Sequence, residues 1–223
     1  MSVVVSWSSG KDAAWTLWAL RQQGAEVTGL MTTVDRATGR VGAHGTPLAV
    51  VEAQARAAGL PLQAVSLPWP APNAAYESAV RAALAEARDS GARRVAFGDL
   101  FLADVRAYRE RLLEGTGLEP VFPLWHPAGG TAALARRMIA GGLEATVVAV
   151  DPGRLNASVV GRPFDADLLA ALPDDVDPCG EQGEFHTVCT AGPMFHRRVE
   201  VRVGEAASRD GVVYAELGAV DEP

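Results

Sequence analysis

A strand-like run of β-branched residues passes into a polar turn in the stretch VVVSWSSGKDAAW at residues 3–15. A helix-like apolar pattern begins immediately after the turn. Backbone N–H groups at a helix N-terminus, with the helix dipole behind them, bind anions. Ser8, Ser9 and Gly10 let the backbone approach a phosphate closely, and the two serines add hydroxyl groups. The stretch therefore predicts a phosphate-binding turn over residues 6–13.

Lys11 is the one lysine among the 20 Lys and Arg residues of the chain. Its compact ammonium on a flexible stem suits a point contact to a phosphate, whereas a guanidinium is planar. Asp12 follows it and is expected either to cap the helix or to hold a magnesium ion. The turn is not a Walker A loop, because Val5 stands where that motif needs a glycine and Asp12 where it needs Ser or Thr.

A second group of titratable residues lies in the stretch GEQGEFHT at residues 180–187. Two glycines this close predict a tight backbone bend, so that Glu181 and Glu184 can converge beside His186. Convergent carboxylates suit an amine-bearing or cationic substrate, ammonia or a metal. The alternative is a solvated acidic loop. We expect these three side chains to face the phosphate-binding turn across a cleft, with Phe185 anchoring the bend.

Two further polar residues follow a predicted strand in the middle of the chain. Asp99 ends that strand, at the edge of the sheet where ligands bind in parallel α/β folds, although it can also cap the next helix. Arg106 lies on that helix and forms an i, i+4 pair with Glu110, which can be no more than helix support. We expect Asp99 to contact the nucleotide and Arg106 to contact the substrate.

Strands and helices alternate through the first two thirds of the sequence. Strands are expected at residues 3–7, 26–34, 62–67, 94–98, 119–123 and 144–150, with helical patterns between them. This alternation predicts βαβ units, and hence an α/β fold with a Rossmann-like parallel sheet that has helices on both faces. The first strand–helix turn of such a sheet is the usual phosphate site.

The pattern changes after residue 151. A short helix at residues 165–172 precedes two strands at 198–203 and 212–217. We therefore expect a nucleotide-binding α/β domain at residues 1–117 and a smaller α+β domain with the substrate site at residues 118–223.

The composition is that of a soluble globular protein, with 48% hydrophobic and 21% charged residues among 223. A net charge of −7 argues against nucleic acid as the main partner. The sequence has no apolar run long enough for a membrane span and no recognisable secretory signal. We therefore expect a cytoplasmic protein that does not bind membranes.

The turn SSGKDAA resembles the S-G-G-x-D-S loop of the PP-loop ATP pyrophosphatases, which split ATP into AMP and pyrophosphate. Ser9 stands where that family has its first glycine, and Ala13 stands where it has a serine. This resemblance implies the fold of the adenine nucleotide alpha hydrolases and ATP as the bound nucleotide. The change at residue 13 removes one hydroxyl contact that the family makes to phosphate.

Three more segments occur in the order typical of one family. They are FGDLFLADVRAYRERL at residues 97–112, LEPVFPLW at 118–125, and DPCGEQGEFHT at 177–187, which leads into AGPMF at 191–195. Together with the turn, they resemble the ATP-dependent diphthine–ammonia ligases of diphthamide synthesis and their bacterial relatives. The resemblance implies adenylation of a carboxylate by ATP with Mg²⁺, followed by transfer to ammonia to form an amide. The carboxylate belongs either to a protein side chain or to a small molecule.

The residues and the resemblance together give a complete expected site. Nucleotide-binding residues are Ser6, Ser8, Ser9, Gly10, Lys11, Asp12 and Asp99; substrate residues are Arg106, Glu181, Glu184 and His186; catalytic residues are Lys11, Asp12 and Glu184. Lys11 is expected to neutralise charge at the α-phosphate. Asp12 is the expected protein ligand of Mg²⁺, which bridges the phosphates.

Two alternatives remain open at this stage. The chain could bind ATP or AMP without ligase chemistry, or it could be a PP-loop sulfurtransferase that modifies tRNA. The second needs a reactive thiol, for which Cys179 is the candidate, but the chain has no CxxC motif. A homodimer is also open.

Overall fold

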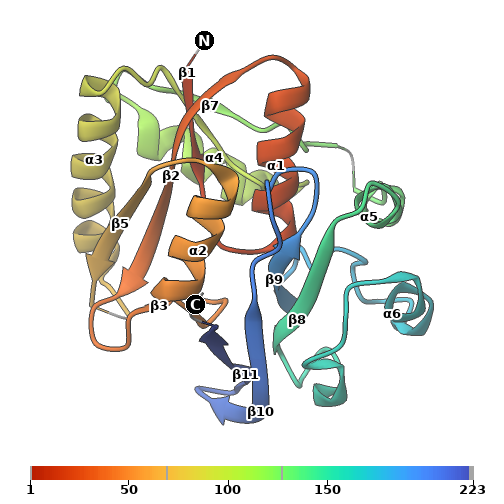
Figure 1. Cartoon of the computed structure of the whole chain (residues 1–223). Helices are drawn as coiled ribbons and strands as arrows, with labels where there is room; N and C mark the ends of the chain where they lie inside the picture. The colour runs from red at the N-terminus through yellow and green to blue at the C-terminus, as the bar shows by residue number, and fades with distance from the viewer. Residues whose placement is uncertain (1, 69, 127, 221–223) are drawn as a thin grey trace.

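The computed structural model describes residues 2–68, 70–126 and 128–220, which form a parallel sheet between helices and a second, antiparallel sheet (Figure 1). In the first sheet, β1 (Ser2–Ser6), β2 (Glu26–Asp35), β5 (Leu62–Leu67), β6 (Arg94–Ala96) and β7 (Glu119–Val121) pair in parallel. The short strands β3 (Arg40–Val41) and β4 (Thr46–Pro47) add an antiparallel hairpin at the end of β2. The Rossmann-like fold class is confirmed.

Helices cover both faces of the first sheet, and the alternation of side chains along β1 shows which helices lie where. Val3 and Val5 pack in one buried cluster with α1 (Lys11–Gln22) and α2 (Leu48–Ala58). Val4 points the other way and packs in a second cluster with α3 (Asn73–Asp89) and α4 (Ala103–Leu113). The strand is therefore buried on both sides, as its uninterrupted β-branched run predicts.

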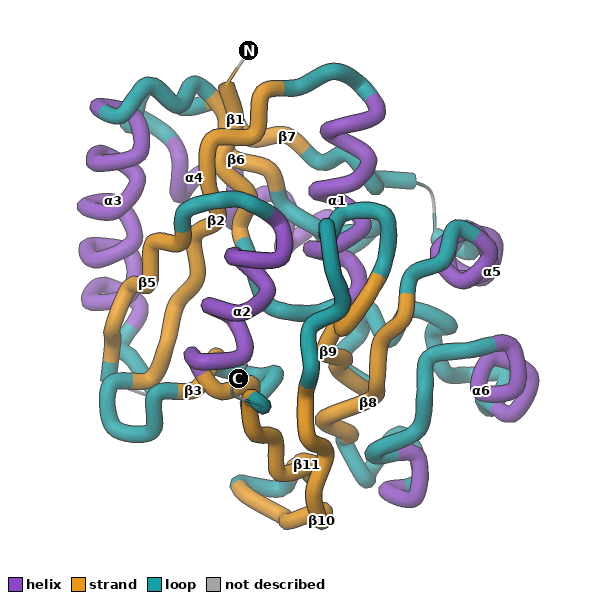
Figure 2. Tube along the Cα trace, in the orientation of Figure 1, coloured by secondary structure: helices purple, strands orange, loops and turns teal. Residues whose placement is uncertain are grey.

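The C-terminal part of the chain forms the second sheet, in the order β10-β11-β8-β9. Its strands are β8 (Glu144–Val150), β9 (Phe185–Ala191), β10 (Val201–Arg209) and β11 (Val212–Ala219), accompanied by α5 (Thr131–Ala140), α6 (Ala166–Ala171) and a 3₁₀ turn (Ala157–Val159). Long loops connect β8 to β9 by way of α6, on the right of Figure 2. This sheet is antiparallel, in contrast to the first.

Three differences from the sequence prediction concern strands. The strand at 144–150 exists, but it belongs to the antiparallel sheet rather than to the parallel one. The strand β9 was not predicted, because it follows the glycine-rich bend directly and is buried through most of its length, so it shows no two-residue alternation. The short strands β3 and β4 were not predicted either.

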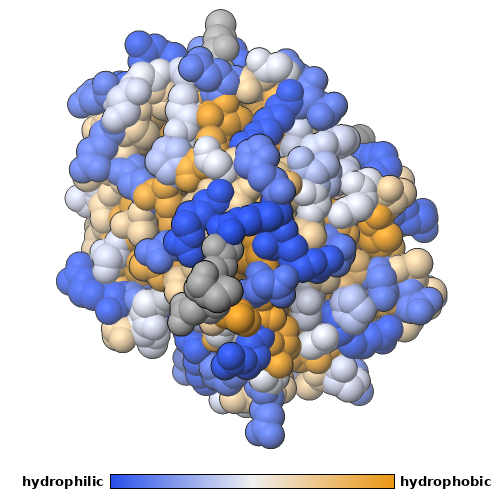
Figure 3. All heavy atoms as spheres, in the orientation of Figure 1, coloured by the Kyte–Doolittle hydropathy of each residue, from blue (hydrophilic) through white to orange (hydrophobic). Residues whose placement is uncertain are grey.

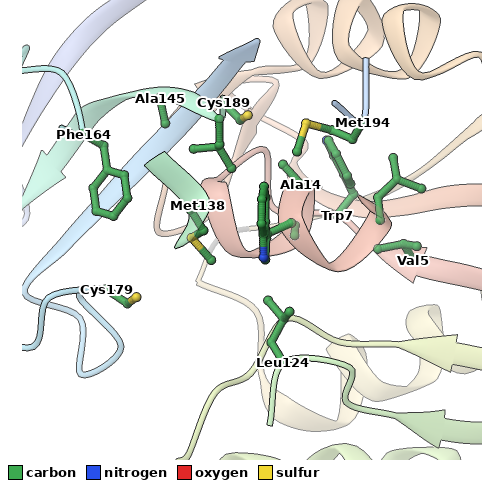
Figure 4. Close-up of a cluster of buried hydrophobic side chains, with 14 of the residues drawn as sticks. Val5, Trp7, Ala14, Leu124, Met138, Ala145, Phe164, Cys179, Cys189 and Met194 are labelled. Atoms are coloured by element: carbon green, nitrogen blue, oxygen red, sulfur yellow. The ribbon is translucent and has the colours of Figure 1, made fainter. Parts of the chain in front are cut away.

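One continuous hydrophobic core joins the two sheets across α1 (Figure 4). Trp7 and Ala14 lie on the side of the first sheet, and Phe164 and Cys189 on the side of the second. Trp7 also meets Phe195 edge-on, with ring centroids 6.2 Å apart. Because α1 packs on both sheets, the turn at its N-terminus is held between them.

Hydrophilic residues cover much of the face seen in Figure 3, and hydrophobic residues appear between them in small groups. Within residues 2–68, 70–126 and 128–220, no helix has the length and apolar character needed to cross a membrane.

The bend before β9 supplies a prediction about stability. Gly180 has φ +68°, and a Cβ there would lie 2.6 Å from the carbonyl oxygen of Phe185. Gly183 has φ +87° with nothing within 4 Å. We expect Gly183→Ala to lower the free energy of unfolding by about 1 kcal/mol through the backbone conformation alone. Gly180→Ala should cost about 1–3 kcal/mol more, because the backbone must also move.

Urea denaturation of the two variants measures both values. Gly183→Ala is the matched control, since it shares the positive φ but not the contact. Equal destabilisation by the two substitutions would contradict the close approach of Phe185 to Gly180.

Candidate active site

The turn between β1 and α1 leaves three consecutive backbone donors without a hydrogen-bond partner. Ser9 has φ +76°, and Gly10 is the N-cap of α1. Among the hydrogen bonds of the described residues, none uses the N–H group of Ser8, Ser9 or Gly10. Successive free N–H groups around a left-handed residue form an anion-binding concavity, and here it lies at a helix N-terminus. The geometry is that of a phosphate site.

The side chain of Ser9 faces the protein rather than this concavity. It is completely buried, and its hydroxyl donates a hydrogen bond to Thr46 Oγ1 at 2.8 Å. Its carbonyl oxygen accepts hydrogen bonds from Gln54 and from the Cys189 N–H group, both at 2.9 Å. The Ser9 hydroxyl is therefore not available to a phosphate, although the Ser9 N–H group has no partner in the protein. The hydroxyl contact expected from the sequence is wrong for this residue.

The ammonium of Lys11 is buried, with the residue only 2% exposed. It donates to Asp12 Oδ2 at 2.8 Å and to the carbonyl oxygen of Cys179. It also lies 5.3 Å from the ring centroid of Phe164 and 5.4 Å from that of Phe185. Burial is the largest single influence on the pKa of Lys11 and lowers it, but Asp12 together with Cys179 and Glu181 outweighs burial, and the pKa is raised. Lys11 is charged and already has protein partners.

Asp12 has one oxygen that the protein does not use. Its Oδ2 pairs with Lys11, whereas its Oδ1 is buried without a hydrogen-bond partner. Burial raises the pKa of Asp12, and Lys11 opposes that rise. No group of three His, Cys, Asp or Glu residues within the described ranges is placed to hold a metal ion. Mg²⁺ commonly binds through one or two carboxylates plus substrate phosphates, and the free oxygen of Asp12 fits that mode.

Two cavities meet beside the turn. The larger, of about 450 Å³, lies at the carboxyl ends of β1 and β2 and reaches α3 and α4, with Met31, Thr33, Tyr76 and Tyr108 in its wall. The smaller, of about 250 Å³, extends toward the bend before β9. The walls of both include Ser6, Ser8, His44, Phe97 and Arg109. The smaller cavity also has Lys11, Asp12, Asp99, Cys179, Glu181 and His186 in its wall.

Glu181 lies in the wall of the smaller cavity, as predicted from the bend. Its Oε1 accepts a hydrogen bond from the Leu100 N–H group at 2.7 Å. Burial raises the pKa of Glu181 to about 7, with repulsion from Asp12 and Asp99 adding to the rise and the Leu100 hydrogen bond opposing it. Near neutral pH the carboxyl group can therefore hold or release a proton.

Glu184 does not line either cavity and is completely buried. Its Oε1 accepts a hydrogen bond from the Asp177 N–H group at 3.0 Å, and its Oε2 accepts one from the Gln182 N–H group at 2.9 Å. The expectation that Glu184 faces the nucleotide turn is wrong. The carboxylate binds the backbone of its own bend, so its role is to hold the shape that presents Glu181.

His186 and His44 lie side by side, with ring centroids 4.6 Å apart. Burial lowers the pKa of His186 to about 4, and the charge of Lys11 contributes. The pKa of His44 is also well below its ordinary value because of burial and the neighbouring His186. His44 Nδ1 lies 3.1 Å from the carbonyl oxygen of Thr187, so this nitrogen carries the proton. Both rings are neutral at pH 7.

Asp99 lies in the wall of the smaller cavity, but Arg106 does not. Arg106 donates to Glu110 at 2.8 Å and stacks over Phe122 and Trp125, with its guanidinium 4.9 and 4.8 Å from their centroids. The predicted substrate contact of Arg106 therefore has no support from either cavity. Arg109, one turn further along α4, lines both cavities instead.

The two cysteines are buried free thiols. Burial raises the pKa of both Cys179 and Cys189 far above the ordinary value. Since the thiolate is the nucleophile, neither residue is set up for sulfur transfer.

Sequence reasoning missed Gln54, Thr187 and Arg109. Gln54 is completely buried on α2 and donates to the carbonyl oxygens of Ser9 and Cys189. The hydroxyl group of Thr187 accepts a hydrogen bond from the Lys11 N–H group at 3.1 Å. An amide on the apolar face of an alanine-rich helix is a recognisable signal for Gln54. Arg109 had no such signal, because whether Arg106 or Arg109 faces the cavity depends on how α4 packs against the segment with Phe122 and Trp125.

Comparisons with known proteins match both parts of the chain to one family. Residues 1–120 match the diphthamide synthase N-terminal domain, and residues 131–216 match the diphthamide synthase C-terminal domain. No curated protein matches the chain by sequence. A solved structure with some likeness is a predicted subunit of a tRNA methyltransferase from Methanocaldococcus jannaschii, at 17% identity and a TM-score of 0.40, covering 66% of this chain and 80% of that one.

Lys11 gives the first prediction for the site. We expect Lys11→Arg to lower turnover by at least about tenfold although it keeps the charge, because a planar guanidinium does not fit the space between Asp12, the Cys179 carbonyl and two rings. The measurement is AMP formation from ATP, with thermal denaturation alongside. Arg136→Lys, on the exposed side of α5, is the matched control and should leave both unchanged. Wild-type turnover in Lys11→Arg would contradict the prediction.

Glu181 gives a prediction about pH. The folded protein holds the proton of Glu181 with a pKa of about 7, against 4.5 for the ordinary group. The proton on Glu181 contributes its full stabilisation below pH 4.5, the ordinary pKa. This contribution is lost as the pH rises through about 7, the pKa in the folded protein. We therefore expect the unfolding free energy of the wild type, relative to Glu181→Gln, to fall between these two pH values. Denaturant titrations of both proteins measure it, and parallel pH curves would contradict the assignment.

Proposed function

The chain belongs to the diphthamide synthase family of ATP-dependent PP-loop enzymes, and we propose that it joins a carboxylate to ammonia, forming an amide and releasing pyrophosphate and AMP. One observation carries the proposal. The turn with three free N–H groups, at Ser8, Ser9 and Gly10, lies beside the junction of two cavities. A nucleotide and a second substrate can therefore meet at the phosphates.

In this proposal the larger cavity holds the adenosine, and the phosphates lie at the turn. The wall of the larger cavity combines apolar side chains such as Met31 and Val80 with the hydroxyl groups of Thr33 and Tyr76. Such a wall suits a purine and a ribose. The hydroxyl groups of Ser6 and Ser8, which line both cavities, are placed to donate to phosphate oxygens.

Mg²⁺ fits the free Oδ1 of Asp12, where it would neutralise phosphate charge when bound with the nucleotide. Lys11 holds the other oxygen of the same carboxylate at 2.8 Å and adds a fixed positive charge to the wall. This arrangement keeps Asp12 in one orientation. Positioning and charge neutralisation then carry most of the catalysis.

The acyl substrate and ammonia occupy the smaller cavity. A carboxylate oxygen of the substrate attacks the α-phosphorus of ATP, and the bond to pyrophosphate breaks. The nitrogen of ammonia then attacks the acyl carbon, the bond to AMP breaks, and one proton is lost from the nitrogen. Glu181, with its pKa of about 7, is placed to receive that proton, and the neutral ring of His186 can accept a hydrogen bond from ammonia.

The buried cysteines weigh against the sulfurtransferase alternative, because neither thiol is activated. Binding of ATP or AMP without ligase chemistry is separated from our proposal by the assay below. A cytoplasmic location, a homodimer and the division of the chain at residue 117 also stay proposals. The strand β7, just beyond that division, still pairs with β6 in the first sheet.

The test is incubation of the protein with ATP, Mg²⁺ and an ammonium salt against a panel of carboxylates, including diphthine-bearing elongation factor and small-molecule acids. We expect AMP and pyrophosphate in equal amounts, together with an amide, for at least one of them. Gly10→Val is the matched negative control, because a Cβ at Gly10 would lie 2.7 Å from His44 Cε1 and the branched side chain fills the turn. Nucleotide binding without AMP formation across the panel would favour the binding-protein alternative.

A further inference from the structure

Arg109 is the one Lys or Arg side chain, within the described residues, that lies in the walls of both cavities. It projects from α4 toward the place where they meet. Arg106, one turn earlier on the same helix, is engaged with Glu110 and two aromatic rings outside the cavities. The two arginines therefore differ in surroundings although they share a helix.

The guanidinium of Arg109 is held in place but keeps unused hydrogen-bonding capacity. It lies 5.1 Å from the ring centroid of Phe97, which lines both cavities. Its Nε is 3.5 Å from Asp99 Oδ2, yet both of these buried atoms lack a hydrogen-bond partner. Stacking on a ring and a loose ion pair fix the plane of the guanidinium. They leave its N–H groups for another acceptor.

Lys11 is the one other Lys or Arg residue in the walls of these two cavities, within the described residues. The ammonium of Lys11 is already bound by Asp12 and the Cys179 carbonyl. The smaller cavity contains the acidic residues Asp12, Asp99 and Glu181. A phosphate chain that passes from the larger cavity to the turn needs positive charge at the junction, where Arg109 lies.

We propose that Arg109 binds the phosphate chain of ATP at the junction of the two cavities, as the cation that recognises the triphosphate. The inference rests on the proposed function only in taking ATP as the nucleotide. A guanidinium presents parallel N–H groups that match two phosphate oxygens, which a lysine does not. Arg109 therefore distinguishes ATP from adenosine.

Calorimetric titration with adenosine and with α,β-methylene ATP, an analogue that is not cleaved at the α-phosphate, tests the assignment. We expect Arg109→Gln to weaken binding of the analogue by at least about tenfold, the loss of one charged hydrogen-bonding group. Binding of adenosine should change by less than about twofold, because the base and ribose lie elsewhere. Arg106→Gln is the matched control and should change neither affinity.

Unchanged analogue affinity in Arg109→Gln would overturn the proposal, and so would an equal loss for adenosine, which would mean that Arg109 shapes the larger cavity. If Arg109→Gln does not fold, Arg109→Lys replaces it, with an expected loss of about threefold for the analogue alone. Full affinity in that variant would also overturn it. Wild-type protein that binds the analogue but forms no AMP would contradict the ligase function and leave the role of Arg109 standing.

Discussion

The buried ammonium of Lys11 is the interaction on which the geometry of the site depends. A charge out of water is costly unless it is paired and hydrogen-bonded, and Lys11 is paired with Asp12 and bonded to the Cys179 carbonyl. One partner is its neighbour on α1, whereas the other lies 168 residues further along the chain. The nucleotide turn and the bend before β9 are therefore parts of one structure, and the ammonium between them keeps them together.

The hydrogen bonds of Ser9 in the turn are also made with residues far away in the sequence. Ser9 adopts a conformation that glycine prefers, and such strain persists only where the surroundings over-determine it. Its hydroxyl bonds Thr46, and its carbonyl oxygen accepts from Gln54 and from β9. These contacts come from three different elements. The N–H groups of Ser8, Ser9 and Gly10, on the opposite side of the turn, are left without a partner in the protein.

The parts of this fold that the sequence predicted are those with a local cause. The strand β8 has the predicted bounds, because two glycines separate its β-branched run from the preceding helix. The placement of Glu184 and of Arg106 had no local cause. A glutamate in a glycine-rich bend has the same sequence pattern whether it faces a substrate or bonds the Asp177 and Gln182 N–H groups. Similarly, the guanidinium of Arg106 stacks on the rings of Phe122 and Trp125, outside the cavity. The periodicity of the helix does not predict this contact, because the two rings belong to another segment.

Burial gives the smaller cavity its chemical character. It raises the pKa of Glu181 to about 7 and lowers that of His186 to about 4. Both shifts favour the uncharged form, which is the protonated carboxyl group of Glu181 and the deprotonated ring of His186. Fixed charge in the wall is confined to pairs: Lys11 with Asp12, and Arg109 with Asp99. Neutral groups bind an uncharged nucleophile such as ammonia without first holding it as an ammonium ion, which has no lone pair to attack with. If ammonia is the nucleophile, as we propose, the same burial that costs folding energy at the bend also favours the uncharged, reactive form of that substrate.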